Sequence, residues 1–314
     1  MRRHTSPALV LLALLAAGCS PGGGEGSSIA RGDRAFAQGN YDEALAEYRL
    51  AVAQGADDGL TFARVAHTFA AMDRADDAGA YYGEATARDS TLVEQAVSDL
   101  MRLAQDARTR GDMFAMASAV ETALRLRPGL GVGDMSLDLA RHYFRSGEYG
   151  RALPFYEKAL GERADSSADV VFEVGRAHEE IGDCAHALVF FERFRAMVRS
   201  WQRGEVDWYI GTCAYELARA RRTRRPASED DLEQALRHLD RVLEVGEPLN
   251  LQAQSWFDKG EILSGLGRCE EAMEAFSQVR YADNAGSLIP RAQERFDQIR
   301  FGRGLETLRE GRCR

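Results

Sequence analysis

A degenerate pattern recurs seven times along this chain, and it constrains the fold more than any other feature of the sequence. Each copy begins near a turn glycine or aspartate, has a small residue five places later and, in the clearest copies, an aromatic residue four places after that. These offsets place the small and aromatic side chains on one face of a helix. The copies occupy residues 39–52, 73–86, 111–124, 147–160, 182–195, 230–243 and 267–280, and the small position is held by Ala44, Ala78, Ala152, Ala187, Ala235 and Ala272, with Met116 as the exception.

A second apolar-periodic stretch precedes most of the turns, for example "FARVAHTFAAM" at 62–72. Each repeat unit is therefore predicted to be two antiparallel helices. The longest spacing between copies contains "ARARRTRRPASEDD" at 218–231, where we expect a long first helix that ends before Pro226. Ser228, with Asp231 three residues later, is typical of a capped helix start.

These helix pairs resemble tetratricopeptide repeats over residues 29–283. Family signature positions fall on Gly32, Gly175, Gly211, Gly260 and Trp256. The resemblance implies an all-α fold, an α-solenoid with a right-handed superhelix of about seven tetratricopeptide-like helix pairs. In residues 284–314 we expect a polar capping helix, "IPRAQERFDQIRFGRG", followed by a tail.

The first residues have the plan of an export signal. Arg2 and Arg3 precede an uncharged run at 8–17, which is too short to span a bilayer, and small residues lead to Cys19. The segment resembles the lipobox of bacterial lipoproteins, although Ala16 stands where that family usually has leucine. The resemblance implies that residues 1–18 are a signal peptide and that acyl chains are attached to Cys19.

Residues 19–28 are rich in glycine and serine and are predicted to be a flexible tether. A plain secretory signal with a coincidental cysteine is the alternative. We expect a lipid-anchored protein of the bacterial cell envelope, facing the periplasm. Ser20 favours the outer membrane by the rule known for enteric bacteria, and the inner membrane is the alternative location.

The net charge of the chain limits the kind of partner that it can bind. The formal net charge is −9, which argues against nucleic acid as the main partner.

Export to an oxidising compartment allows cysteines to pair. In the repeat stacking, Cys184 and Cys213 lie on neighbouring antiparallel helices and are the favoured disulfide pair, with Cys269 and Cys313 as a weaker candidate. The alternative is that Cys184 and Cys269 only fill a packing position.

Motifs for catalysis or metal binding are weak in this sequence. His178, Glu179, Cys184 and His186 are close in sequence, but His178 and Cys184 take core positions of the repeat, so we predict no metal site. "GLGVG" at 129–133 follows no strand and is interpreted as a turn. No HExxH, phosphate loop or nucleophile elbow occurs, so we expect neither catalytic residues nor a cofactor.

In the tetratricopeptide family the first helices line a concave groove that takes peptide segments. Helical register places six side chains on this groove: Arg141, Phe172, Arg176, Trp208, Tyr215 and Phe257. Aromatic residues and arginine dominate interface energetics. Five arginines lie at 219–225. We interpret them as cations that interact favourably with the dipole at the C-terminal end of a helix, rather than as a site for an acidic partner or lipid headgroups.

Three functions are compatible with these features. The favoured one is a membrane-anchored scaffold that binds segments of other envelope proteins, similar to repeat lipoproteins of outer-membrane protein assembly and to secretin pilotins. The alternative is a non-enzymatic binder of a cell-wall or small-molecule ligand. An enzyme is the least favoured, because no nucleophile, base and orienting residue occur at recognisable spacing.

Overall fold

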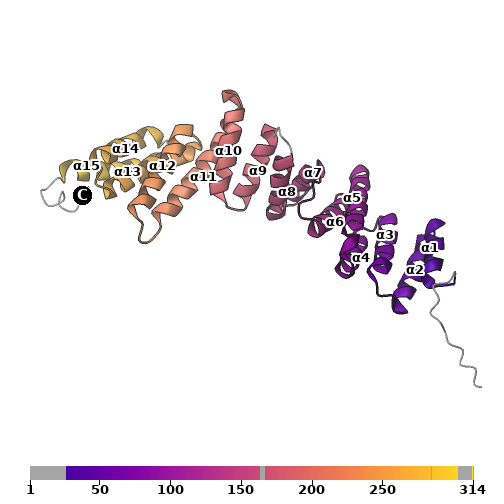
Figure 1. Ribbon diagram of the computed structural model, residues 1–314. Coiled ribbons are helices and arrows are strands. Elements are labelled where there is room, and N and C mark those ends of the chain that lie inside the picture. Colours follow the sequence, from indigo (N-terminus) through magenta and orange to yellow (C-terminus); the bar gives the residue numbers. More distant parts are fainter. Residues whose placement is uncertain (1–25, 163–166, 284, 303–312, 314) are drawn as a thin grey trace, which may run out of the picture. The chain divides into compact units, whose positions relative to one another are not determined.

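The computed structural model describes residues 26–162, 167–283, 285–302 and 313, and in these ranges it contains helices and turns but no strand (Figure 1). The chain divides into two compact units, residues 1–130 and 131–314. The all-α, helix-pair prediction is confirmed. The first unit contains α1 (Ser28–Ala37), α2 (Tyr41–Ala53), α3 (Gly59–Ala71), α4 (Ala75–Arg88), the short 3-10 turn η1 (Ser90–Leu92), α5 (Val93–Arg110) and α6 (Met113–Leu126).

The second unit contains the remaining copies of the helix-pair pattern and one additional helix. Its elements are α7 (Met135–Arg145), α8 (Tyr149–Glu162), α9 (Ala168–Glu180), α10 (Cys184–Met197), the 3-10 turn η2 (Ser200–Gln202), α11 (Gly204–Arg222), α12 (Glu229–Val245), α13 (Leu249–Gly265), α14 (Cys269–Ala282) and α15 (Ile289–Phe301). In both units each odd-numbered helix up to α13 packs against the even-numbered helix that follows it.

Tight turns join the two helices of most pairs. The turn residue has a positive φ, 77° at Gly39 and 79° at Gly182, and Asp73 takes the same conformation with φ 59°. Glycine adopts this left-handed region without a steric penalty, and aspartate tolerates it better than most residues. The turn glycines of the sequence pattern therefore mark the points at which the chain reverses.

The small and aromatic positions of the pattern form the core of each pair. All seven small positions are fully buried, and the aromatic positions Tyr48, Tyr82, Tyr156, Phe191 and Phe276 are buried as well. A glycine on the first helix faces the aromatic ring: a Cβ added to Gly175 would lie 2.6 Å from Phe191 Cε1, and Gly32 and Gly260 meet Tyr48 and Phe276 in the same way. Glycine is required there because the ring occupies the space of a side chain.

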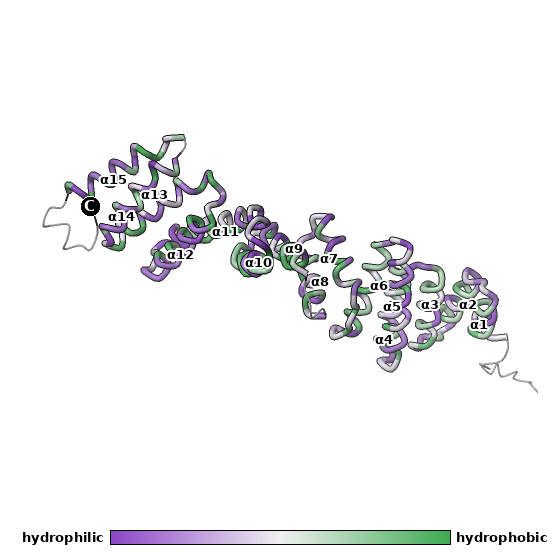
Figure 2. Tube along the Cα trace, turned by 90° about the horizontal axis from the view of Figure 1, so that it is seen from above, coloured by the Kyte–Doolittle hydropathy of each residue, from purple (hydrophilic) through white to green (hydrophobic). Residues whose placement is uncertain are grey.

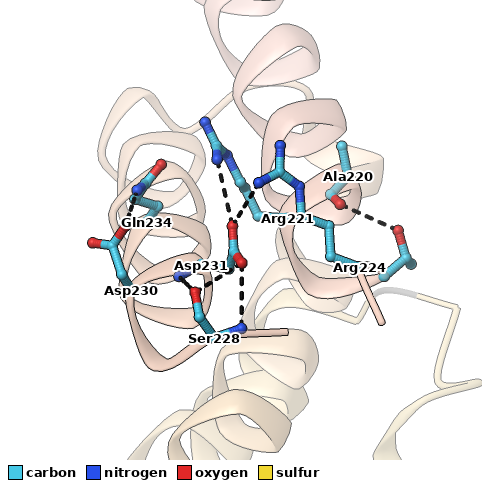
Figure 3. A network of polar contacts seen from close by, with 8 residues as sticks. Ala220, Arg221, Arg224, Ser228, Asp230, Asp231 and Gln234 are labelled. Atoms are coloured by element: carbon cyan, nitrogen blue, oxygen red, sulfur yellow. Dashed lines mark hydrogen bonds and ion pairs between the residues drawn. The ribbon is translucent and has the colours of Figure 1, made fainter. Parts of the chain in front are cut away.

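The arginine-rich connection after α11 is built around one carboxylate (Figure 3). Ser228 Oγ accepts a hydrogen bond from Asp231 N, and Asp231 Oδ2 accepts one from Ser228 N, so the predicted cap of α12 is present. Arg221 and Arg224 both donate to Asp231 Oδ1, at 3.4 and 3.0 Å. Arg222 pairs with Asp258, and Arg219 pairs with Glu216. Most of the local positive charge is thus neutralised within the fold.

The stability that this cap contributes is expected to depend on pH. Hydrogen bonds from Ser228 hold the pKa of the Asp231 carboxyl below its ordinary value. Such a carboxyl stabilises the fold above its unfolded pKa, about 3.9, and the contribution is lost as the pH falls through the folded pKa. Asp231→Asn should therefore lower the thermal midpoint near pH 6, and the difference from wild type should shrink below about pH 4. Circular dichroism melts across this range test it; a pH-independent difference would contradict this role of Asp231.

Helix α15 closes the second unit, as the sequence predicts. Ala292 and Ile299 are buried in the core cluster that contains Phe276. Cys313 is bonded to Cys269 with a Cα–Cα distance of 5.5 Å, and Ser264 Oγ donates a hydrogen bond to the carbonyl oxygen of Cys313. Cys313 is therefore tied to both α13 and α14.

Hydrophobic and hydrophilic residues are interspersed along the helices of both units (Figure 2). None of the helices in the described part of the chain combines the length and the apolar character needed to cross a membrane. The predicted signal peptide, Cys19 and most of the tether lie outside the described residues, and α1 begins at Ser28 with Ser27 as its N-cap.

Candidate functional site

Carboxylates on the first helices link three groups of residues, which we call the carboxylate triads. In each triad a tyrosine of a second helix donates its hydroxyl hydrogen bond to the carboxylate, and a basic side chain of a neighbouring first helix pairs with it. The triads are Tyr48–Asp33–Arg64 and Tyr82–Asp99–His67 in the first unit and Tyr156–Glu173–Arg141 in the second. Successive first helices are thus linked by polar contacts, which are half-buried for His67–Asp99 and Arg141–Glu173 and exposed for Arg64–Asp33.

In the second triad, burial and hydrogen bonding shift the pKa values of Tyr82 and Asp99 in directions that favour their hydrogen bond. Burial, together with the Asp99 carboxylate, raises the pKa of Tyr82, so its hydroxyl stays a donor. Burial would raise the pKa of Asp99, but hydrogen bonds from His67 and Tyr82 outweigh it and the pKa is lowered. Charge-assisted hydrogen bonds of this kind are stronger than neutral ones.

Arg141, one of the predicted groove residues, belongs to the third triad. Its guanidinium makes a two-pronged contact with Glu173, with Nε–Oε2 and Nη2–Oε1 distances both 2.9 Å. Its side chain is still partly exposed. The pairing of Arg141 with Glu173 was not predicted from the sequence. A signal for it was present: in each triad the basic residue and the carboxylate are 31 or 32 residues apart, which is close to the repeat length.

Five aromatic side chains from α9, α10 and α11 form an aromatic cluster: Phe172, Phe191, Phe194, Trp208 and Tyr209. Ring centroids are 4.9 Å apart for Phe172 and Phe194, 5.7 Å for Phe172 and Tyr209, and 5.0 Å for Trp208 and Tyr209. Phe191 is fully buried beneath them, whereas Trp208 is 44% exposed. The cluster therefore continues from the core to the surface at Trp208.

Arg176 covers one side of this cluster. Its guanidinium carbon lies 4.6 Å from the centroid of the Tyr209 ring, a cation–π distance, and Arg176 also pairs with Glu180 at 3.0 Å and Glu179 at 3.6 Å. Burial lowers the pKa of the guanidinium, but the hydrogen bond to Glu180 and the nearby charges outweigh it and raise the pKa overall. The structure thus brings Phe172, Arg176 and Trp208, all predicted from the sequence, into one surface with Tyr209.

Two predicted groove residues lie elsewhere. Tyr215 is half-buried and donates a hydrogen bond of 3.2 Å to Asp258 Oδ2. The prediction that Phe257 is exposed in the groove is wrong: it is 5% exposed. Its ring packs against Phe276 at 5.6 Å, and Arg291 of α15 lies over it at 4.8 Å, so the closing helix covers this position.

The start of α10, beside the cluster, is joined to α11 by a disulfide. Cys184 and Cys213 are bonded, with a Cα–Cα distance of 5.0 Å. Cys213 is buried in the same core cluster as Phe191, Val206 and Ile210. The bond therefore fixes α11, which carries Trp208 and Tyr209, to the preceding helix pair.

Two surface hollows are lined by both apolar and polar residues. One of about 180 Å³ in the first unit is lined by Asp33, Phe36, Leu60, Arg64, His67 and Gln95. A larger one of about 440 Å³ in the second unit is lined by Arg222, Thr223, Arg225, Leu232, Glu261 and Gly265. The second lies beside the arginine-rich connection and is large enough to hold part of a small ligand.

Comparison with known proteins supports the repeat architecture. A family model described as tetratricopeptide repeat matches residues 101–169, 137–203 and 228–287, which together cover more than half of the chain. No curated protein matches the chain significantly.

Solved structures of tetratricopeptide repeat proteins match this chain at low sequence identity and low TM-score. The C-terminal part of a TPR repeat-containing protein from Cytophaga hutchinsonii is 15% identical (TM-score 0.32), covering 83% of this chain and 97% of that one. YrrB, described as a TPR protein with an unusual peptide-binding site, is 17% identical (TM-score 0.30; 79% and 97% covered). PilW, described as a type IV pilus biogenesis factor, is 15% identical (TM-score 0.29; 75% and 98% covered).

Proposed function

The chain belongs to the tetratricopeptide repeat family, and we propose that it is a scaffold that binds segments of partner proteins at the aromatic cluster. Such repeats are typically protein-interaction scaffolds rather than enzymes. The observation that carries the proposal is the exposed edge of the cluster, where Trp208 lies beside Tyr209 and Arg176 lies over the Tyr209 ring. Tryptophan, tyrosine and arginine are the residue types that most often dominate binding energy.

The side chains and the disulfide beneath this surface hold it in place, which favours binding without rearrangement. Phe191 packs against Phe172 and Tyr209 from below, and the Cys184–Cys213 bond ties α10 to α11. A surface whose side chains are already fixed loses less conformational entropy on binding. Because Arg176 is paired with glutamates, the partner segment needs apolar side chains against Trp208 more than it needs acidic ones.

We further propose that the scaffold is anchored in the bacterial envelope by lipid on Cys19, at the outer membrane facing the periplasm. The supporting features are the apolar leader, the cysteine at its end and the Gly/Ser-rich segment that follows. Two or more acyl chains give stable anchoring, whereas one gives only marginal binding. Segments of other envelope proteins would then be the partners.

The alternative is a binder of a cell-wall or small-molecule ligand, for which the hollow beside Arg222 and Arg225 is the candidate. Binding of the purified protein to an array of envelope-protein peptides, compared with pull-down by cell-wall glycans, separates the two. We expect peptide binding, weakened about tenfold or more by Trp208→Ala. Leu50→Ala is the matched control, because Leu50 is 43% exposed on a second helix. Glycan binding that is insensitive to Trp208→Ala would favour the alternative.

A further inference from the structure

A cluster of two histidines and one aspartate lies at the turn between α9 and α10, apart from the residues assigned to partner binding. His178 is in the last turn of α9, Asp183 is the N-cap of α10 and His186 is in its first turn. One ligand atom from each residue lies within 4.8 Å of the others. We propose that these three side chains form a binding site for a divalent transition-metal ion of the zinc type.

The turn places the ligands through its backbone. The carbonyl oxygen of His178 accepts a hydrogen bond of 2.9 Å from Asp183 N, and Gly182 has a φ of 79°. The chain therefore reverses so that the side chain of Asp183 returns over the end of α9. The Cys184–Cys213 bond fixes the next residue to α11.

Asp183 uses its two carboxylate oxygens differently. Oδ1 accepts the capping hydrogen bond from His186 N at 3.2 Å, while Oδ2 lies 2.6 Å from His186 Nδ1 and 3.6 Å from His178 Nδ1. Oδ2 is thus the atom that both imidazoles face. A metal ion among the three would replace the contact between Asp183 and His186 without disturbing the cap.

The burial of His178 is a second, independent indication of a metal site. It is 7% exposed, and its buried Nδ1 has no hydrogen-bond partner. Its ring is held between Phe190, at 5.5 Å and an interplanar angle of 12°, and His186, at 5.3 Å. A buried nitrogen without a partner is costly, and a metal ion in front of it would remove that cost.

The donor set selects the class of ion. Imidazole nitrogen suits zinc, copper and nickel, and a single carboxylate adds charge compensation without favouring calcium or magnesium, which prefer oxygen ligands throughout. Ligand atoms must lie about 2.0–2.2 Å from zinc. His186 is largely exposed and can turn toward the ion, whereas His178 is already fixed. Three protein ligands leave one tetrahedral position open.

Titration of the purified, oxidised full-length protein with ZnCl₂ by calorimetry tests the site, with Co²⁺ absorption as a spectroscopic readout of tetrahedral coordination. We expect about one ion per chain. Mutation of a residue that only orients a metal ligand lowers metal affinity by about 10–100-fold. His186→Ala removes a ligand itself and should therefore lower zinc affinity by at least about 100-fold. Asp183→Asn, which keeps a capping oxygen, should also weaken binding.

The matched control is His67→Ala, because His67 pairs with a carboxylate at 2.9 Å in its triad. It should leave zinc affinity unchanged. Zinc should also raise the thermal midpoint of the wild type but not of His186→Ala, which separates loss of binding from loss of folding. Absence of binding to the wild type, or equal affinity in His186→Ala, would overturn the proposal.

Discussion

Replacing Phe191 with alanine is expected to lower the free energy of unfolding of the second unit by about 3–5 kcal/mol. Phe191 is fully buried, stacks on Tyr209 at 5.2 Å and fills the space opposite Gly175. Loss of the ring leaves a cavity between three helices, because the backbone around Gly175 supplies no side chain to refill it. Urea denaturation followed by circular dichroism measures the effect.

Val189→Ala is the control for this experiment, since Val189 lies on the same helix but is 63% exposed. It should change the stability by no more than about 0.5 kcal/mol. If Phe191→Ala and Val189→Ala had similar effects, the aromatic position would not be the structural centre of the repeat.

Replacing Cys19 with serine is expected to move the protein from the membrane fraction to the soluble fraction of the cell. The physical reason is that the acyl chains proposed on Cys19 would supply the hydrophobic energy of anchoring, about 0.8 kcal/mol for each buried methylene. Cell fractionation, with the mass of the purified N-terminal peptide, measures both location and acylation. Ser20→Ala serves as the control and should leave the protein in the membrane fraction.

A plain secretory signal predicts the opposite outcome. In that case the wild-type protein would be soluble, its N-terminal peptide would carry no acyl chain, and Cys19→Ser would change neither. The scaffold would then act without an anchor, and the peptide-binding part of the proposal would be unaffected.

The sequence predicts the helix pairs well because their signals are local. Gly39 and Gly182 mark turns whose φ only glycine adopts easily, and Ala187 and Phe191 are four residues apart on one helical face. The cap formed by Ser228 and Asp231 is another short-range signal that the structure contains. Such features need no knowledge of the neighbouring repeat.

The surface is harder to predict because it depends on what the next helix covers. Phe257 and Trp208 both fall on the predicted groove by register, yet α15 buries Phe257 while Trp208 stays exposed. His178 is a core histidine, as its register indicates, but its approach to Asp183 depends on the path of the turn. Charged residues are common on helices, so the pairing of Arg141 with Glu173 requires the offset between helices to be known.

Site-specific photo-crosslinking in living cells decides whether partner proteins bind at Trp208. A photoreactive phenylalanine analogue is placed at Trp208, or at Leu50 as the equally exposed control, and the crosslinked proteins are identified by mass spectrometry. We expect adducts with a small set of envelope proteins from position 208 that are absent from position 50. Absence of adducts at 208, or the same adducts from both positions, would contradict the scaffold proposal.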